Sequence, residues 1–138
     1  MHFFGFTVYI ARQSDENQWI QADLRTSHVI ASVTTQGRLG QHAQWVTSYY
    51  VSYSQDGTDW TDIPTLYSGN VDQESKVTNR LPANTLARYV RLRPHQWNNG
   101  IALRFDATGC AVARKLSHTV ARSKDRVIMY SHCRQKIL

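Results

Sequence analysis

Cysteine is scarce in this 138-residue chain, and its scarcity excludes several structural classes. The two cysteines, Cys110 and Cys133, are too few to define a disulfide-built scaffold. Their spacing also matches no zinc or redox motif. On the sequence alone, they pair with each other, pair with another chain or remain free.

Long apolar runs are missing as well. No segment reaches the ~18 consecutive apolar residues expected of a membrane-spanning helix. Residues 1–10 are apolar, but they lack a basic n-region, and Arg12 follows without a small-residue cleavage site, so they make a poor signal peptide. We interpret them as a β-strand.

Catalytic and metal-binding motifs are absent from the sequence. It contains no nucleophile elbow, no glycine-rich phosphate loop and no CxxC. Its few carboxylates form no convincing acid–base pair. The six histidines are scattered, with no HExxH and no close pair at ligand spacing. We therefore expect no enzymatic activity, no metal site and no cofactor.

The positive charge is confined to one part of the chain. Residues 1–110 contain nine Lys or Arg and nine Asp or Glu, whereas residues 111–138 contain seven Lys or Arg against Asp125 alone. We predict one domain over residues 1–110 and a basic tail over residues 111–138 that is disordered or weakly helical. A basic tail is only a weak indication of polyanion binding, and we expect no nucleic-acid partner.

A β-hairpin is the clearest local prediction. Residues 48–60 alternate in polarity on both sides of Asp56-Gly57, which predicts a type I′ turn at that dipeptide. The side chains expected to share one face of this hairpin are those of Tyr49, Val51 and Tyr53.

Other short strands follow at near-regular spacing, which predicts an all-β sandwich or barrel. One of them, residues 87–93, should end at Pro94, because proline is excluded from sheet interiors. The remaining strands are expected over residues 18–24, 28–35, 66–71 and 101–105. Three tryptophans are predicted to fill core or strand-packing positions: Trp19, Trp60 and Trp97.

Nine blocks of residues recur in an order that is more specific than any block alone. They are Trp19 to Leu24, Thr35 to Arg38, Trp45 to Tyr49, Tyr53 to Trp60, Gly69 to Asp72, Ala87 to Leu92, Pro94 to Trp97, Ile101 to Arg104 and Gly109-Cys110. Together they resemble the pattern of the discoidin, or coagulation factor 5/8 type C, family over residues 17–110.

The resemblance implies a discoidin-like jelly-roll β-sandwich, a distorted barrel of short antiparallel strands, whose loops at one end bind the ligand. Family members bind phosphatidylserine membranes, glycans, collagen or other proteins, usually as one module of a secreted or cell-surface chain. This chain lacks the N-terminal cysteine that would pair with Cys110, and residues 1–16 replace the opening strand and the first ligand loops. We expect an N-terminally truncated member with a non-family tail.

The loop that follows Gly37 is the main candidate site that the resemblance provides. Leu39 beside Arg38 suits an anionic phospholipid surface, because an apolar tip enters the interface while a cation meets a lipid phosphate. We expect an extracellular, non-enzymatic adhesion module that recognises a phospholipid membrane, or a cell-surface or matrix protein. The predicted ligand loop consists of Arg38, Leu39, Gly40, Gln41, His42 and Ala43.

Two alternatives remain open. A lectin-like domain would bind carbohydrate through an aromatic platform and planar polar side chains, for which Trp45, Gln41, Gln44 and Asn98 are the candidates. The basic tail would otherwise bind polyanions by itself, and that binding would fall steeply with added salt.

Overall fold

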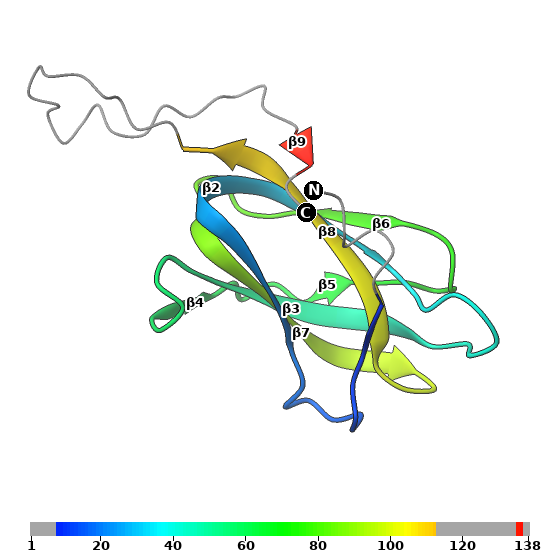
Figure 1. The fold of residues 1–138 in the computed structure, drawn as a ribbon. Helices are drawn as coiled ribbons and strands as arrows, with labels where there is room; N and C mark the ends of the chain where they lie inside the picture. The colour runs from blue at the N-terminus through cyan, green and yellow to red at the C-terminus, as the bar shows by residue number, and fades with distance from the viewer. Residues whose placement is uncertain (1–7, 113–134, 137–138) are drawn as a thin grey trace, which may run out of the picture.

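The chain forms one antiparallel sheet that curls into a distorted barrel (Figure 1). The computed structural model describes residues 8–112 and 135–136, which contain no helix. Most of the predicted tail and the first seven residues of the predicted opening strand lie outside these ranges. The strands are β1 (Tyr9–Ile10), β2 (Ile20–Gln36), β3 (Trp45–Ser54), β4 (Trp60–Asp62), β5 (Tyr67–Ser68), β6 (Val77–Arg80), β7 (Leu86–Asn98), β8 (Ala102–Ala111) and β9 (Gln135–Lys136).

The strand order is β1-β8-β2-β7-β3-β4, with β5 beside β3, β6 beside β2 and β9 beside β8. The first residues of β2 pair with β7, starting with Ile20 opposite Leu92. Its last residues lie between β6 and β8, where Thr35 is opposite both Val77 and Phe105. The long strand β2 therefore belongs to both halves of the barrel, which Figure 1 shows as a blue-to-cyan arc over the top.

The prediction of separate strands over residues 18–24 and 28–35 is wrong, because β2 runs through both. A pairing irregularity lies between Asp23 and His28, and Arg25 within it has a φ of 71°. An irregularity of this kind bends a strand without ending it. A bend of this kind needs no glycine or proline, and residues 24–27 contain neither, so the sequence carried no direct signal for it.

The predicted hairpin is present, but its type I′ turn is wrong. Ser54 pairs with Trp60, so five residues, 55–59, connect the strands. Gly57 has a φ of 78°, whereas Asp56 does not have a positive φ as a type I′ turn requires. The Asp56 carboxylate instead accepts hydrogen bonds from the backbone N–H groups of Thr58 and Asp59, both at 2.8 Å.

The prediction that Pro94 ends its strand is also wrong, since β7 continues to Asn98. Pro94 pairs with Tyr49 of β3 at a register shift beside Ser48. The pairing of β7 with β2 has stopped by then, at Leu92. A proline without an N–H is tolerated where a strand has a neighbour on one side and an irregular register.

The core lies between the curled halves of the sheet. Tyr49 and Val51 of β3 are fully buried, and Tyr53 packs against the same cluster, which confirms their shared face. The rings of Tyr49 and Tyr67 stack with 5.8 Å between centroids. The other large, fully buried apolar side chains are Ile30, Val33, Val46, Val90, Leu92, Ile101 and Leu103.

The tryptophans divide between the core and the outer face of the sheet. Trp97 packs against the core, as predicted. Trp19 is 46% exposed, and its ring and that of Trp60 flank the guanidinium of Arg91 at 4.0 and 3.9 Å from the ring centroids. Burial between the two rings lowers the pKa of Arg91. Trp19 and Trp60 therefore do not belong to the core cluster, and both instead contact Arg91 of β7.

Candidate functional site

Four segments meet at one end of the barrel, which we call the loop end: residues 11–19, 37–44, 69–76 and 98–101. The Nδ2 of Asn98 donates to the Ala43 carbonyl at 2.9 Å, which joins two of these segments. The backbone N–H of Ile101 donates to Ser14 Oγ at 3.0 Å, which joins a third. Loop 37–44 precedes β3 and therefore projects from its first residue.

Loop 37–44 closes on itself at its base. The Arg38 N–H donates to the Gln44 carbonyl at 2.9 Å, and Arg38 Nη1 donates to Gln44 Oε1 at 2.8 Å. Gly40 has a φ of 98°, a conformation that favours glycine. Gly37 allows a close approach, because a Cβ there would lie 2.8 Å from the Cα of Gln73.

Gln73 holds this loop against the neighbouring one. Its Nε2 lies 2.8, 3.0 and 2.8 Å from the carbonyl oxygens of Arg38, Gly40 and His42. An amide nitrogen has only two hydrogens, so the three contacts share them. One side chain of loop 69–76 thus fixes three carbonyls of loop 37–44, and the two loops form one unit.

Buried polar groups support both loops from below. Arg104, on β8, is 8% exposed and donates from Nε to the Gly37 carbonyl at 2.9 Å and from Nη2 to the Gln73 carbonyl at 3.3 Å. Asn70 is fully buried, and its Nδ2 donates to the carbonyls of Thr35 and Ser75. These donors satisfy loop carbonyls that would otherwise be buried without partners, which is costly.

A carboxylate cap shapes the second loop. The Asp72 carboxylate accepts hydrogen bonds from the backbone N–H groups of Glu74 and Ser75 and from Ser75 Oγ. These bonds, above all those from Ser75, lower the pKa of Asp72. The described residues contain no group of histidine, cysteine or carboxylate side chains arranged to hold a metal ion.

This arrangement of strands and loops has known counterparts. Residues 6–106 match the profile of the F5/8 type C domain. The chain belongs to this family.

Relatives of this F5/8 type C domain occur within longer proteins. Neuropilin-1a of Danio rerio is 36% identical over 104 residues, which cover 70% of this chain and 11% of that protein. Lactadherin of Sus scrofa is 34% identical over 113 residues, covering 76% of this chain and 28% of that protein. The chain therefore spans about a tenth to a quarter of these relatives.

A solved structure supports the discoidin-like fold directly. Discoidin II of Dictyostelium discoideum superposes with a TM-score of 0.71 and 31% identity, over 77% of this chain and 42% of that one. The resemblance and the jelly-roll fold class predicted from the sequence are confirmed. As an F5/8 type C domain, the chain is a ligand-binding module.

The structure places the predicted loop residues together on the surface of the loop end. Leu39 is 55% exposed, and residues 40–43 are exposed beside it. Arg38 is half-buried because its guanidinium binds Gln44. Leu39 is thus exposed, whereas the guanidinium of Arg38 is engaged with Gln44 inside the loop.

The candidate glycan contacts are also brought together, but two of them are engaged within the domain. Gln44 accepts from Arg38 and donates from Nε2 to the Asn99 carbonyl at 2.9 Å. The Asn98 amide nitrogen donates to Ala43. Trp45 is half-buried beside Gly37. Gln44 and Asn98 act as braces for the loop, which leaves Gln41 as the exposed planar polar side chain among these candidates.

Two residues of this F5/8 type C domain were missed from the sequence. Val71 is 79% exposed, more than Leu39, and it lies two positions before Gln73, whose amide holds loop 37–44. Its signal was an apolar residue between Asn70 and Asp72 in a polar turn, where no core position explains it. Gln73 gave no signal, because its three acceptors lie more than thirty residues earlier in the chain.

Proposed function

We propose that this F5/8 type C domain is an extracellular adhesion module that binds anionic phospholipid membranes through the apolar tips Leu39 and Val71. The observation that carries the proposal is their joint exposure, 55% and 79%, on two loops that Gln73 locks together. Exposing apolar side chains to water costs free energy, and burying them in a lipid interface removes that cost.

Preorganisation supports this role. The loops are already held by Gln73 and Arg104, so insertion would not have to order them first. Binding that requires no ordering of the loop keeps more of its contact free energy. A rigid edge with two apolar residues therefore suits an interface better than either residue on a separate flexible loop.

The charges of the loop end shape the expected salt dependence. Its cationic side chains at neutral pH are Arg12, Arg38 and Lys76, and its carboxylates are Asp15, Glu16, Asp72 and Glu74. This balance provides no cationic excess to attract a membrane. We therefore expect vesicle binding to change little with added salt, unlike the steep loss expected if the basic tail were responsible.

The first prediction tests the two tips. The double variant Leu39→Ala, Val71→Ala should weaken binding to vesicles of phosphatidylserine and phosphatidylcholine about tenfold, because two exposed apolar side chains lose most of their buried area. Sedimentation with vesicles measures the change. Leu66→Ala is the matched control, because Leu66 is 45% exposed but precedes β5, whereas loop 69–76 follows that strand.

Unchanged vesicle binding in the double variant would contradict the proposal, as would an equal loss in the Leu66 variant. The alternative ligand, a carbohydrate, would use Gln41 and Trp45 rather than the apolar tips. Gln41→Ala separates the two: it should leave vesicle binding intact and abolish binding on a glycan array if carbohydrate is the ligand.

A further inference from the structure

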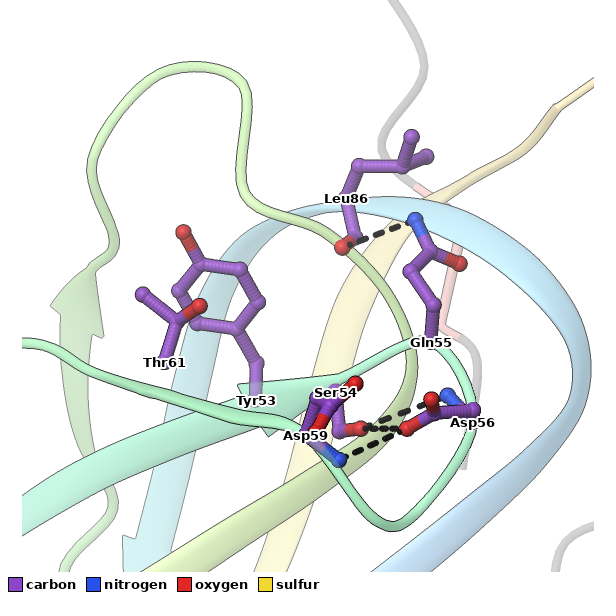
Figure 2. Close-up of a pocket in the computed structure, with 7 residues that line it drawn as sticks. All are labelled: Tyr53, Ser54, Gln55, Asp56, Asp59, Thr61 and Leu86. Atoms are coloured by element: carbon purple, nitrogen blue, oxygen red, sulfur yellow. Dashed lines mark hydrogen bonds between the residues drawn. The ribbon is translucent and has the colours of Figure 1, made fainter.

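The end of the barrel opposite the loop end contains a cavity, and none of its lining residues belongs to the loop-end segments. It is about 250 Å³ in volume and is lined by residues 53–56, Asp59, Thr61 and Leu86 (Figure 2). The hairpin loop 55–59 follows the last residue of β3, whereas loop 37–44 precedes the first. At about 3.3 Å per residue, ten strand residues place the two sites about 30 Å apart.

One wall of the cavity is the hairpin loop, and it is fixed by its own hydrogen bonds. Asp56 Oδ1 accepts from the N–H groups of Thr58 and Asp59 and from Ser54 Oγ, the last at 3.0 Å. These bonds lower the pKa of Asp56. Trp60 Nε1 donates to the Gly57 carbonyl at 3.2 Å and closes the loop.

A second wall is fixed by Gln55. Its Nε2 donates to the Leu86 carbonyl at 3.1 Å, and its Oε1 accepts from Ser27 Oγ at 2.7 Å. Figure 2 shows Gln55 and Leu86 joined by this bond on one side and Tyr53 with Thr61 on another. Both walls are therefore in place before any ligand arrives.

The groups left over define the chemistry of the cavity. Within the part of the chain that the structure describes, the carboxylate of Asp59 and the hydroxyls of Tyr53 and Thr61 have no hydrogen-bond partner. No lysine or arginine lines the cavity. What it offers is one available carboxylate, an aromatic ring, two hydroxyls and the aliphatic side chain of Leu86.

We propose that this cavity binds the side chain of an arginine from a partner protein, with its guanidinium between the Tyr53 ring and the Asp59 carboxylate. A guanidinium stacks on aromatic rings and pairs with carboxylates through several N–H groups. The volume is below the ~300–1,000 Å³ of sites for drug-sized ligands, so it suits a single side chain. The cavity is open to solvent, so a single arginine should bind it only weakly, as an auxiliary contact.

The domain already shows the same combination nearby. The Arg88 guanidinium lies 4.9 Å from the centroid of the Tyr89 ring and binds the Asp23 carboxylate at 2.9 and 3.0 Å. An aromatic ring, a carboxylate and an arginine are therefore already in contact on this surface. The cavity has the first two of these groups and lacks the third.

The test is an NMR titration of ¹⁵N-labelled full-length chain with Nα-acetyl-arginine methylamide. Nα-acetyl-citrulline methylamide, which has the same shape without the charge, is the matched ligand. Arginine should shift the amide signals of residues 53–61 and 86, and citrulline should not. In Asp59→Asn the affinity for arginine should fall about fivefold, the size expected for an exposed ion pair, whereas Tyr53→Phe, which keeps the ring, should retain it.

Glu74→Gln, which removes an exposed carboxylate at the loop end, is the control and should bind like the unmodified chain. Equal shifts with citrulline would overturn the proposal, and so would an unchanged affinity in Asp59→Asn with a normal thermal melt. Shifts confined to loop 37–44 would overturn it as well. The outcome is independent of vesicle binding, because the double variant at Leu39 and Val71 leaves the cavity untouched.

Discussion

The two ends of the barrel are built by the same device and present opposite surfaces. At each end a carboxylate caps a turn, Asp72 at the loop end and Asp56 in the hairpin. At each end a glutamine side chain binds the backbone of another segment, Gln73 at one and Gln55 at the other. Yet the loop end projects two apolar side chains, whereas the hairpin end surrounds a cavity that contains the Asp59 carboxylate.

At both ends the side chains that hold the loops differ from those proposed to contact a ligand. At both ends polar side chains form hydrogen bonds with backbone groups of the domain, so these groups are not available to a ligand. The residues that we propose for ligand contact are different ones: Leu39 and Val71 at the loop end, Asp59 and Tyr53 at the hairpin end. A conspicuous polar side chain near a binding surface is thus often a brace, as Gln44 is.

The largest difference in stability between the two ends is expected when a glycine at each end is replaced by alanine. Gly37→Ala should lower the free energy of unfolding by about 2–3 kcal/mol, because its Cβ would lie 2.8 and 2.9 Å from backbone atoms of Gln73 and Asp72. Gly57→Ala should cost only about 1 kcal/mol, for its positive φ, since its Cβ would meet the Tyr89 ring at an ordinary 3.4 Å. Urea unfolding of the two variants measures both values, and equal losses would break the contrast.

Replacing the glutamines that bind backbone carbonyls, Gln73 and Gln55, should give the next largest difference between the two ends. Gln73→Ala should cost about 1–2 kcal/mol of stability through lost hydrogen bonds and should also weaken vesicle binding, because loop 37–44 loses its clamp. Gln55→Ala should cost about 1 kcal/mol and leave vesicle binding unchanged. Urea unfolding and vesicle sedimentation test both variants. A loss of vesicle binding in Gln55→Ala would show that the two ends are coupled.

Much of this scaffolding was beyond prediction from sequence. The alternation of Tyr49, Val51 and Tyr53 shows which face is buried, because a strand repeats every two residues. The family blocks also located loop 37–44 as a surface loop. The bend in β2 and the continuation of β7 past Pro94 depend instead on which strands lie alongside, and neighbours distant in the chain leave no local pattern. The engagement of Asn98 with Ala43 is of the same kind.

Acid should produce the smallest difference between the ends. The Arg88 guanidinium, which binds Asp23 near the hairpin end, lowers the pKa of that carboxyl to about 2 from its usual 3.8. The stability from this pair is fully present above pH 3.8 and is lost as the pH falls toward 2. Both side chains are more than a third exposed, so the effect is small.

Carboxyl-detected NMR titration checks this value directly. Arg88→Met should return the Asp23 pKa toward 3.8 and remove that part of the acid dependence of unfolding. Asp72 should keep its lowered pKa in the same variant, because its cap comes from Ser75 at the other end. A shift of Asp72 in Arg88→Met would mean that the ends communicate.

The bend in β2 lets this strand pair in both halves of the barrel, and this affects how the domain unfolds. Its first residues complete the half of the barrel that contains β7, and its last residues complete the half that contains β8. Neither half keeps its full set of backbone pairings once this strand detaches. The domain is therefore expected to open as one cooperative unit, with no half surviving as a folded intermediate, so that damage at either end is felt by the whole barrel.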